Sequence, residues 1–233
     1  MKRVFILGLS ISLLTGGISS CKKTSKRKMV NEWSITEFKS VATIKNDFGV
    51  NSKIVKVLDG ASLKTTSTGV PSSVGGSSMN LELSGTVNTW TYSIKKDGTW
   101  SSKEDITTTW VDSTFDSSVW NVVTHKENEL KETSGIWNFI GKSKTEDFKK
   151  NERVLFNILV SNAKKSVTSG GNDPQVIVNK NTYIAGEKVL VFTVVESKNK
   201  ELILQTDSKH SNVNSDGNIF NSSYTSTFTL TEK

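Results

Sequence analysis

The chain has very little of the residues that support disulfide, metal and redox chemistry. Cys21 is the only cysteine among 233 residues, so no disulfide can form within one chain. The only two histidines are His125 and His210, and neither has a second histidine or a cysteine nearby in the sequence. A zinc site draws on several such ligands. We therefore expect no metal and no cofactor, and a fold that is stable through its hydrophobic core alone.

The common catalytic motifs are also missing. The chain has no Gly-x-Ser-x-Gly sequence, and its paired glycines lack the strand–loop–helix setting of a phosphate-binding loop. Glu104 and Asp105 are adjacent on an expected strand, so they point to opposite faces, whereas glycoside hydrolysis needs two facing acids. We interpret both as surface charges. The sequence predicts that the protein is not an enzyme.

Prolines are scarce as well, with only two in the chain, while serine, threonine, asparagine and lysine are abundant. This composition is typical of β-strands joined by polar turns. Helix formers such as alanine and leucine are sparse, which makes a helical protein improbable on composition. A chain of this length forms one all-β domain or at most two small ones.

The first twenty residues have the order of a secretory signal peptide, with basic Lys2 and Arg3, an apolar run and a small-residue exit. The apolar run Val4–Leu14 is too short to cross a bilayer, because eleven residues rise only about 16 Å as a helix. Ile18-Ser19-Ser20-Cys21 resembles the lipobox of bacterial lipoprotein signals. The resemblance implies cleavage before Cys21 and acyl chains on its sulfur and new amino group. The alternative is an ordinary secreted protein.

A basic segment follows the cysteine. Loss of residues 1–20 would lower the net charge from +7 to about +5. The segment contains five of the remaining positive charges, on Lys22, Lys23, Lys26, Arg27 and Lys28. Near an anionic bilayer each contributes about 1 kcal/mol to anchoring, and the alternative is a solvated tether. The rest of the chain is close to neutral, which argues against nucleic-acid binding. We expect residues 21–28 to be a lipidated basic tether.

Alternating apolar and polar residues predict antiparallel strands over most of residues 29–233, which we expect to form one domain. The clearest example ends the chain, where Tyr224, Ser226, Phe228 and Leu230 alternate with threonines. A shift of the alternation near Asn88 predicts a β-bulge. The segment Ala61–Ser78 is rich in serine, threonine and glycine, and we expect a long loop or a meandering edge there.

One turn is predicted in detail. A three-residue loop at Lys96-Asp97-Gly98, with Gly98 at positive φ, pairs Ile94 with Trp100. A two-residue Asp-Gly turn would instead pair Ile94 with Ser101. The first register gathers Trp90, Tyr92 and Ile94 on one face with Trp100, Ile106 and Trp110, so we expect the three-residue loop.

Aromatic residues are the candidate ligand contacts. Four tryptophans recur at ten-residue intervals, which predicts that they lie at a similar level of the fold. They line either a ligand pocket or the packed core, and core packing is the more common use of such residues. The candidates are Trp90, Tyr92, Trp100, Trp110, Trp120 and Trp137.

The strand pattern predicts an all-β fold, an up-and-down antiparallel meander of about eight to ten strands that closes into a barrel. A two-sheet β-sandwich would show similar local patterns and is the alternative. The arrangement resembles the lipocalin-like domain lipoproteins of Bacteroidota. The resemblance rests on the lipoprotein signal, the early Trp33, the hairpin 96–100, the strand start at 134–137 and the threonine-alternating final strand.

The resemblance implies a lipocalin-like barrel that holds a small apolar ligand. Surface-exported lipoproteins of this group carry acidic residues after the cysteine, whereas this segment is basic, so we expect the periplasmic face of the outer membrane. We therefore expect a monomeric, membrane-anchored binding protein of the cell envelope with an enclosed apolar cavity of about 300 Å³ or more. The alternative is a non-catalytic interaction lipoprotein with a solid core, which binds an envelope protein or glycan through an exposed face.

Overall fold

A computed structural model describes residues 25–46, 51–71, 78–116, 119–142, 151–213 and 219–233. Cys21 and the expected signal peptide lie outside these residues. Within these ranges, one short helix, α1 (Ser25–Met29), precedes eleven strands. The strands are β1 (Asn31–Asn46), β2 (Asn51–Asp59), β3 (Ser62–Pro71), β4 (Ser78–Ile94), β5 (Thr99–Asp116), β6 (Val119–Ile140), β7 (Glu152–Ser169), β8 (Gln175–Thr182), β9 (Val189–Ser197), β10 (Glu201–Val213) and β11 (Ile219–Glu232).

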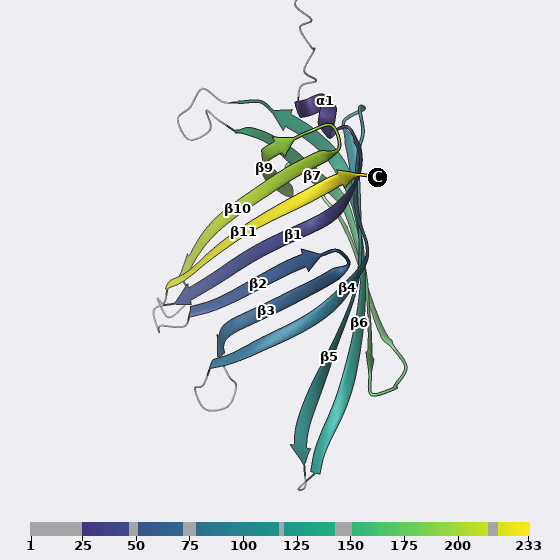
Figure 1. The fold of residues 1–233 in the computed structure, drawn as a ribbon, viewed down its shortest axis with the longest axis vertical. Coiled ribbons are helices and arrows are strands. Elements are labelled where there is room, and N and C mark those ends of the chain that lie inside the picture. The colour runs from purple at the N-terminus through teal and green to yellow at the C-terminus, as the bar shows by residue number, and fades with distance from the viewer. Residues whose placement is uncertain (1–24, 47–50, 72–77, 117–118, 143–150, 214–218) are drawn as a thin grey trace, which may run out of the picture.

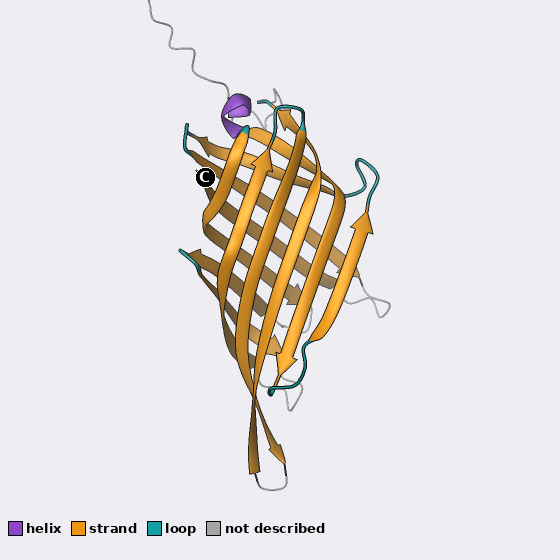
Figure 2. Cartoon of the chain, turned by 90° about the vertical axis from the view of Figure 1, so that its right-hand side faces the viewer, coloured by secondary structure: helices purple, strands orange, loops and turns teal. Residues whose placement is uncertain are grey.

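Ten of these strands form a closed antiparallel barrel (Figure 1). Neighbouring strands follow the order β6-β5-β4-β3-β2-β1-β11-β10-β9-β7, and the β6–β7 pairing closes the ring. β8 lies outside the ring and pairs only with β7. Strands of the near wall cross those of the far wall in Figure 2, as the tilt of a closed barrel requires. The predicted barrel is confirmed, and the sandwich alternative is wrong.

The barrel is narrow at the end that carries α1 and wide at the other end. At the narrow end, Asn31–Ser34 of β1 pair directly with Thr91–Ile94 of β4, so eight strands surround the interior. Farther down, the hairpin β2–β3 inserts between β1 and β4 like a wedge. Its tip is fixed where the Val87 amide donates to the Ala61 carbonyl at 2.8 Å. An eight-stranded barrel is just filled by its own side chains, whereas additional strands leave open space.

On the opposite wall of the barrel, β7 changes its pairing partner at the same height. The first part of β7 pairs with β9, and Val160–Val167 of β7 pair with β8. β10 pairs with β9 only over Leu202–Gln205. Among the described residues, no pairing joins β8 to the rest of β10.

α1 covers the narrow end of the barrel. Met29 is completely buried there, and its carbonyl accepts a 2.8 Å hydrogen bond from the Trp33 indole. The Lys28 ammonium donates to the Ser197 carbonyl at 2.8 Å. Residues 25–28 of the expected tether, 21–28, belong to this helix, and residues 21–24 lie outside the described residues.

Local details of the meander follow the sequence in two places and depart from it in a third. Ile94 pairs with Trp100, Gly98 has a φ of 86°, and the register shifts between Val87 and Thr89, which confirms the three-residue loop and the bulge. The expected long loop or meandering edge over Ala61–Ser78 is wrong for residues 62–71, and residues 72–77 lie outside the described residues. Residues 62–71 form β3, because strands on both sides satisfy the backbone of this serine- and threonine-rich segment.

Candidate ligand site

The candidate aromatic residues lie at different heights along the barrel. Trp100 and Trp137 are 2% and 5% exposed and belong to the core at the narrow end, while Trp90 and Tyr92 pack against that core half-buried. Trp110 lies ten residues farther along β5, near the wide end. The expectation of one common level is therefore wrong, since Trp100 and Trp110 share a single long strand. The side chain of Trp120 lies outside the described residues.

Aromatic rings fill the narrow half of the barrel. Trp100 and Phe156 have ring centroids 4.8 Å apart, and Phe156 meets Phe192 at 5.8 Å. The layer of rings nearest the wide end contains Phe38, Trp90 and Phe228, whose ring centroids lie 4.8 to 6.0 Å apart. We call these three rings the aromatic floor. In the described part of this half, buried apolar side chains and contacting rings form one continuous core.

The inward face becomes polar directly beyond the aromatic floor. Ser40 follows Phe38 on the inward face of β1 and pairs with Ser226 of β11. Ser226 is completely buried, and its hydroxyl has no hydrogen-bond partner. A buried hydroxyl without a partner costs about 1–3 kcal/mol, so this position is suited to a polar group that the chain itself does not supply.

Apolar side chains on the inward face of the wide half remain exposed to solvent. The register aligns them with buried Phe38, Leu63 and Phe228, so they point into the barrel. They are Ile44 (41% exposed), Leu83 (37%), Tyr224 (38%) and Ile177 (51%). We call the space that they surround the vestibule. Its lining is partly apolar and lies open to water, which is unusual for the inside of a barrel and typical of a binding surface.

Charged groups share the vestibule with these apolar side chains. Glu104 of β5 pairs with Lys131 of β6 on the inward face, and both face Lys56 of β2 across the barrel. Burial raises the pKa of the Glu104 carboxyl, and Glu129 raises it further against the opposing effect of Lys131 and Lys56. Burial also raises the pKa of the Tyr92 phenol, with a contribution from Glu104.

The interpretation of Glu104 as a surface charge is therefore wrong. Glu104 has the same strand parity as Trp100 and Ile106, and this shared parity is the sequence signal that places it inside. Asp105 lies on the outer face, as expected from its neighbouring position, and it accepts hydrogen bonds from Asn88 and Asn128.

Replacement of Glu104 by glutamine is expected to stabilise the protein at neutral pH. The folded state disfavours the carboxylate, so the destabilisation is absent below the ordinary pKa of 4.5 and grows as pH rises through the raised folded pKa. The Glu104→Gln protein should thus melt a few degrees higher than wild type at about pH 7.5. At about pH 4 the two proteins should melt at the same temperature. Circular dichroism melts measure this. Glu132→Gln, on the outer face, serves as the control, and a Glu104→Gln protein that melts lower at neutral pH would contradict the prediction.

A second inward cluster lies farther toward the wide end. The His125 ring lies 2.8 Å from the Ser169 hydroxyl through Nδ1 and 3.2 Å from the Asp112 carboxylate through Nε2, and it stacks on Trp110. These contacts tie β5, β6 and β7 together. Asp112 is 63% exposed, and Ser169 ends β7 beside an exposed glycine turn.

The outer surface carries a groove of about 380 Å³ across β4, β5, β6 and β7. Its centre is lined by small hydroxyl side chains such as Ser93, Ser101 and Ser134. Charges border it, including Lys103, which lies 3.8 Å from Glu132. The groove is polar and open, so it differs from the expected apolar cavity in both position and chemistry.

Within the described ranges, no helix is long and apolar enough to cross a membrane, and no group of three or more histidine, cysteine, aspartate or glutamate side chains is arranged to hold a metal ion. Comparison of the chain with protein-family models, curated proteins and solved structures found no match. The assignment of the candidate site is therefore based on its geometry alone.

Proposed function

We propose that this protein is a lipid-anchored binding protein of the cell envelope, whose vestibule takes a small amphiphilic molecule or lipid. The single observation that carries the proposal is the set of inward-facing but exposed apolar side chains at Ile44, Leu83, Tyr224 and Ile177. An apolar chain that binds against these side chains is removed from contact with water. Burial of apolar surface contributes about 25 cal/mol per Å².

The neighbouring polar groups support a ligand with a polar head. Lys56, Glu104 and Lys131 offer charges of both signs, and the buried Ser226 hydroxyl has no partner of its own. A purely apolar ligand would leave these charges facing hydrocarbon, which is unfavourable.

Titration with dodecylphosphocholine below its micelle concentration tests the proposal. Calorimetry should detect binding of this probe and none of free phosphocholine. Because the Ile44→Ser, Leu83→Ser double variant removes apolar contact area, we expect it to weaken binding about tenfold. The control is Val111→Ser with Val122→Ser, which replaces two valines on the outer face that are 58% and 66% exposed. Equal effects of the two double variants, or no binding of the probe, would contradict the proposal.

A second candidate function is interaction with an envelope protein or glycan. It is favoured by the packed core at the narrow end and by the outer groove of about 380 Å³ with its serine hydroxyls. Ser134→Arg would fill this groove and leave the vestibule unchanged. Loss of a partner in this variant, with binding of dodecylphosphocholine preserved, would favour the groove.

A further inference from the structure

The proposed anchor constrains which end of the barrel faces the membrane. Cys21 precedes Ser25 of α1 by four residues, and four residues span at most about 14 Å when fully extended. Acyl chains on Cys21 enter the bilayer at that residue. The narrow end of the barrel, which α1 covers, must therefore lie close to the membrane surface.

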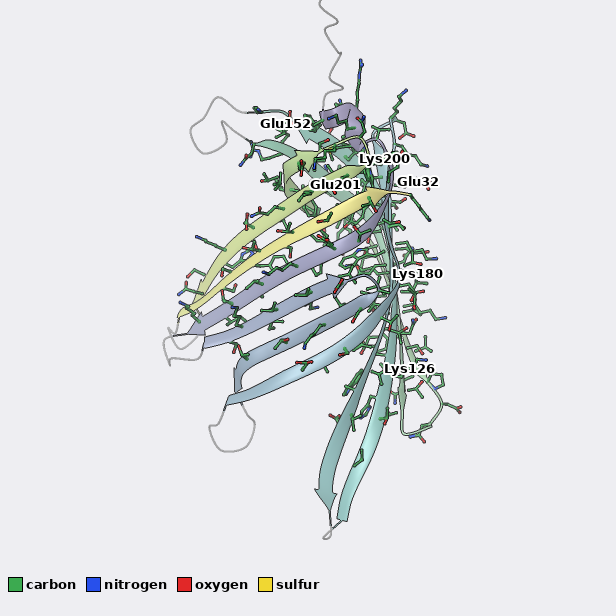
Figure 3. All side chains as sticks on the ribbon, in the orientation of Figure 1. Glu32, Lys126, Glu152, Lys180, Lys200 and Glu201 are labelled. Atoms are coloured by element: carbon green, nitrogen blue, oxygen red, sulfur yellow. The ribbon has the colours of Figure 1, made fainter. Side chains whose placement is uncertain are left out.

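Positive charge gathers at this same end. Besides the helix residues Lys26 and Arg27, exposed lysines occupy the turns between β4 and β5, between β9 and β10, and after β6. These are Lys95, Lys96, Lys198, Lys200 and Lys142. Figure 3 shows Lys200 at the α1 end together with Glu32, Glu152 and Glu201, whereas Lys126 and Lys180 lie farther down the barrel.

Most of these cations have no acidic partner among the described residues. Lys198 contacts Glu196 at 2.9 Å and Glu201 at 3.4 Å, but no ion pair between described residues involves Lys26, Arg27, Lys95, Lys96, Lys142 or Lys200. The one acid in the β4–β5 turn, Asp97, accepts hydrogen bonds from Thr99. Lys95 acts on the Asp97 carboxyl and Lys198 is paired with two glutamates, so the three turns carry positive charge that is compensated only in part.

We propose that the narrow end is a docking surface for anionic lipid headgroups, with Lys96 and Lys200 extending the basic surface of α1. The inference rests on the proposed anchor at Cys21 and adds an orientation to it. Each lysine near an anionic surface contributes about 1 kcal/mol, and the attraction acts over about one Debye length. The vestibule then opens away from the bilayer, so its ligand arrives from the aqueous side.

Fluorescence transfer to a lipid-borne acceptor tests the orientation. Cys21 is the only native cysteine, so in the acylated protein an introduced cysteine can be labelled alone. Asn199→Cys places the label in the β9–β10 turn, and Asn172→Cys places it in the β7–β8 turn as the control. In phosphatidylcholine vesicles that contain phosphatidylglycerol, transfer from position 199 should exceed transfer from position 172 about threefold, because transfer falls steeply with distance and only the first turn lies beside the anionic surface.

Charge variants test the role of the lysines. Lys96→Glu with Lys200→Glu should lower the ratio to its value in pure phosphatidylcholine, as should about 1 M salt, where the Debye length is about 3 Å. Lys126→Glu with Lys180→Glu changes the net charge equally and should leave the ratio unchanged. An equal response of the two pairs would overturn the proposal, as would similar transfer from both labels.

Vesicle flotation separates this inference from the anchor on which it rests. Flotation that persists in high salt supports the anchor, and charge-dependent transfer then supports the docking surface. Flotation in low salt only, lost with the Lys96 and Lys200 variant, would overturn the anchor and support the surface. Flotation in high salt with no charge dependence of transfer would support the anchor and overturn the surface.

Discussion

Gly135→Ala is expected to destabilise the protein more than any other glycine substitution in the described barrel. A Cβ at this position would lie 1.9 Å from the Asn157 carbonyl oxygen and 3.0 Å from the Leu159 amide nitrogen. Both are backbone atoms of β7, at the place where its register against β6 shifts. The strands cannot separate freely, because the Trp100 indole donates to the same carbonyl at 3.1 Å.

The expected loss is about 4 kcal/mol, at the upper end of the range for single substitutions. For a domain of this size it corresponds to a fall in Tm of about 10 °C. Thermal and urea unfolding, followed by circular dichroism, measure the change. A Gly135→Ala protein that melts with the wild type would show that β7 can move away from β6 at little cost.

Gly141→Ala is the matched control for this prediction. Gly141 follows the end of β6, and a Cβ there would meet no atom within 4 Å. We expect a change within about 0.5 kcal/mol, as for ordinary surface substitutions. If both alanine variants lost stability equally, the steric explanation for Gly135 would be wrong.

The sequence predicts the local geometry of the barrel better than its cross-section. The bulge near Asn88 and the loop at Gly98 are visible because alternation and turn chemistry are local properties. The wedge β2–β3 is not visible, because residues 62–71 read as a polar loop and become a strand only between two partners. The widening of the barrel depends on that wedge. The vestibule therefore could not be predicted from the sequence, and neither could the change from packed core to open lining.

The position of Glu104 was within reach of the same local reasoning. It lies two residues from Ile106 and four from Trp100, and the predicted register places these two residues on one face. Alternation along the strand then places Glu104 on that face and Asp105 on the opposite one. Charge alone suggested an exposed position, but an inward carboxylate is tolerated here because the wide half of the barrel admits water and Lys131 lies opposite. Composition was a weaker guide than strand parity.

Trp100→Ala and Trp110→Ala are expected to differ strongly, although the sequence presents the two residues alike. Trp100 is 2% exposed, contacts the rings of Tyr92 and Phe156 and donates to the Asn157 carbonyl. Its truncation should cost about 3–5 kcal/mol, because the surrounding barrel cannot collapse into the space. Trp110 is half-buried and stacks on His125 at 5.2 Å, so its truncation should cost about 1 kcal/mol.

Urea unfolding of the two variants measures this contrast directly, since both replace the same side chain on the same strand. Equal losses would mean that the wide half is packed as tightly as the narrow half, and the vestibule would then not exist as an open space. A large difference would locate the stability of the barrel in its eight-stranded narrow end. The wide end would then be free to carry exposed apolar and charged groups that contribute little to folding and remain available to a ligand.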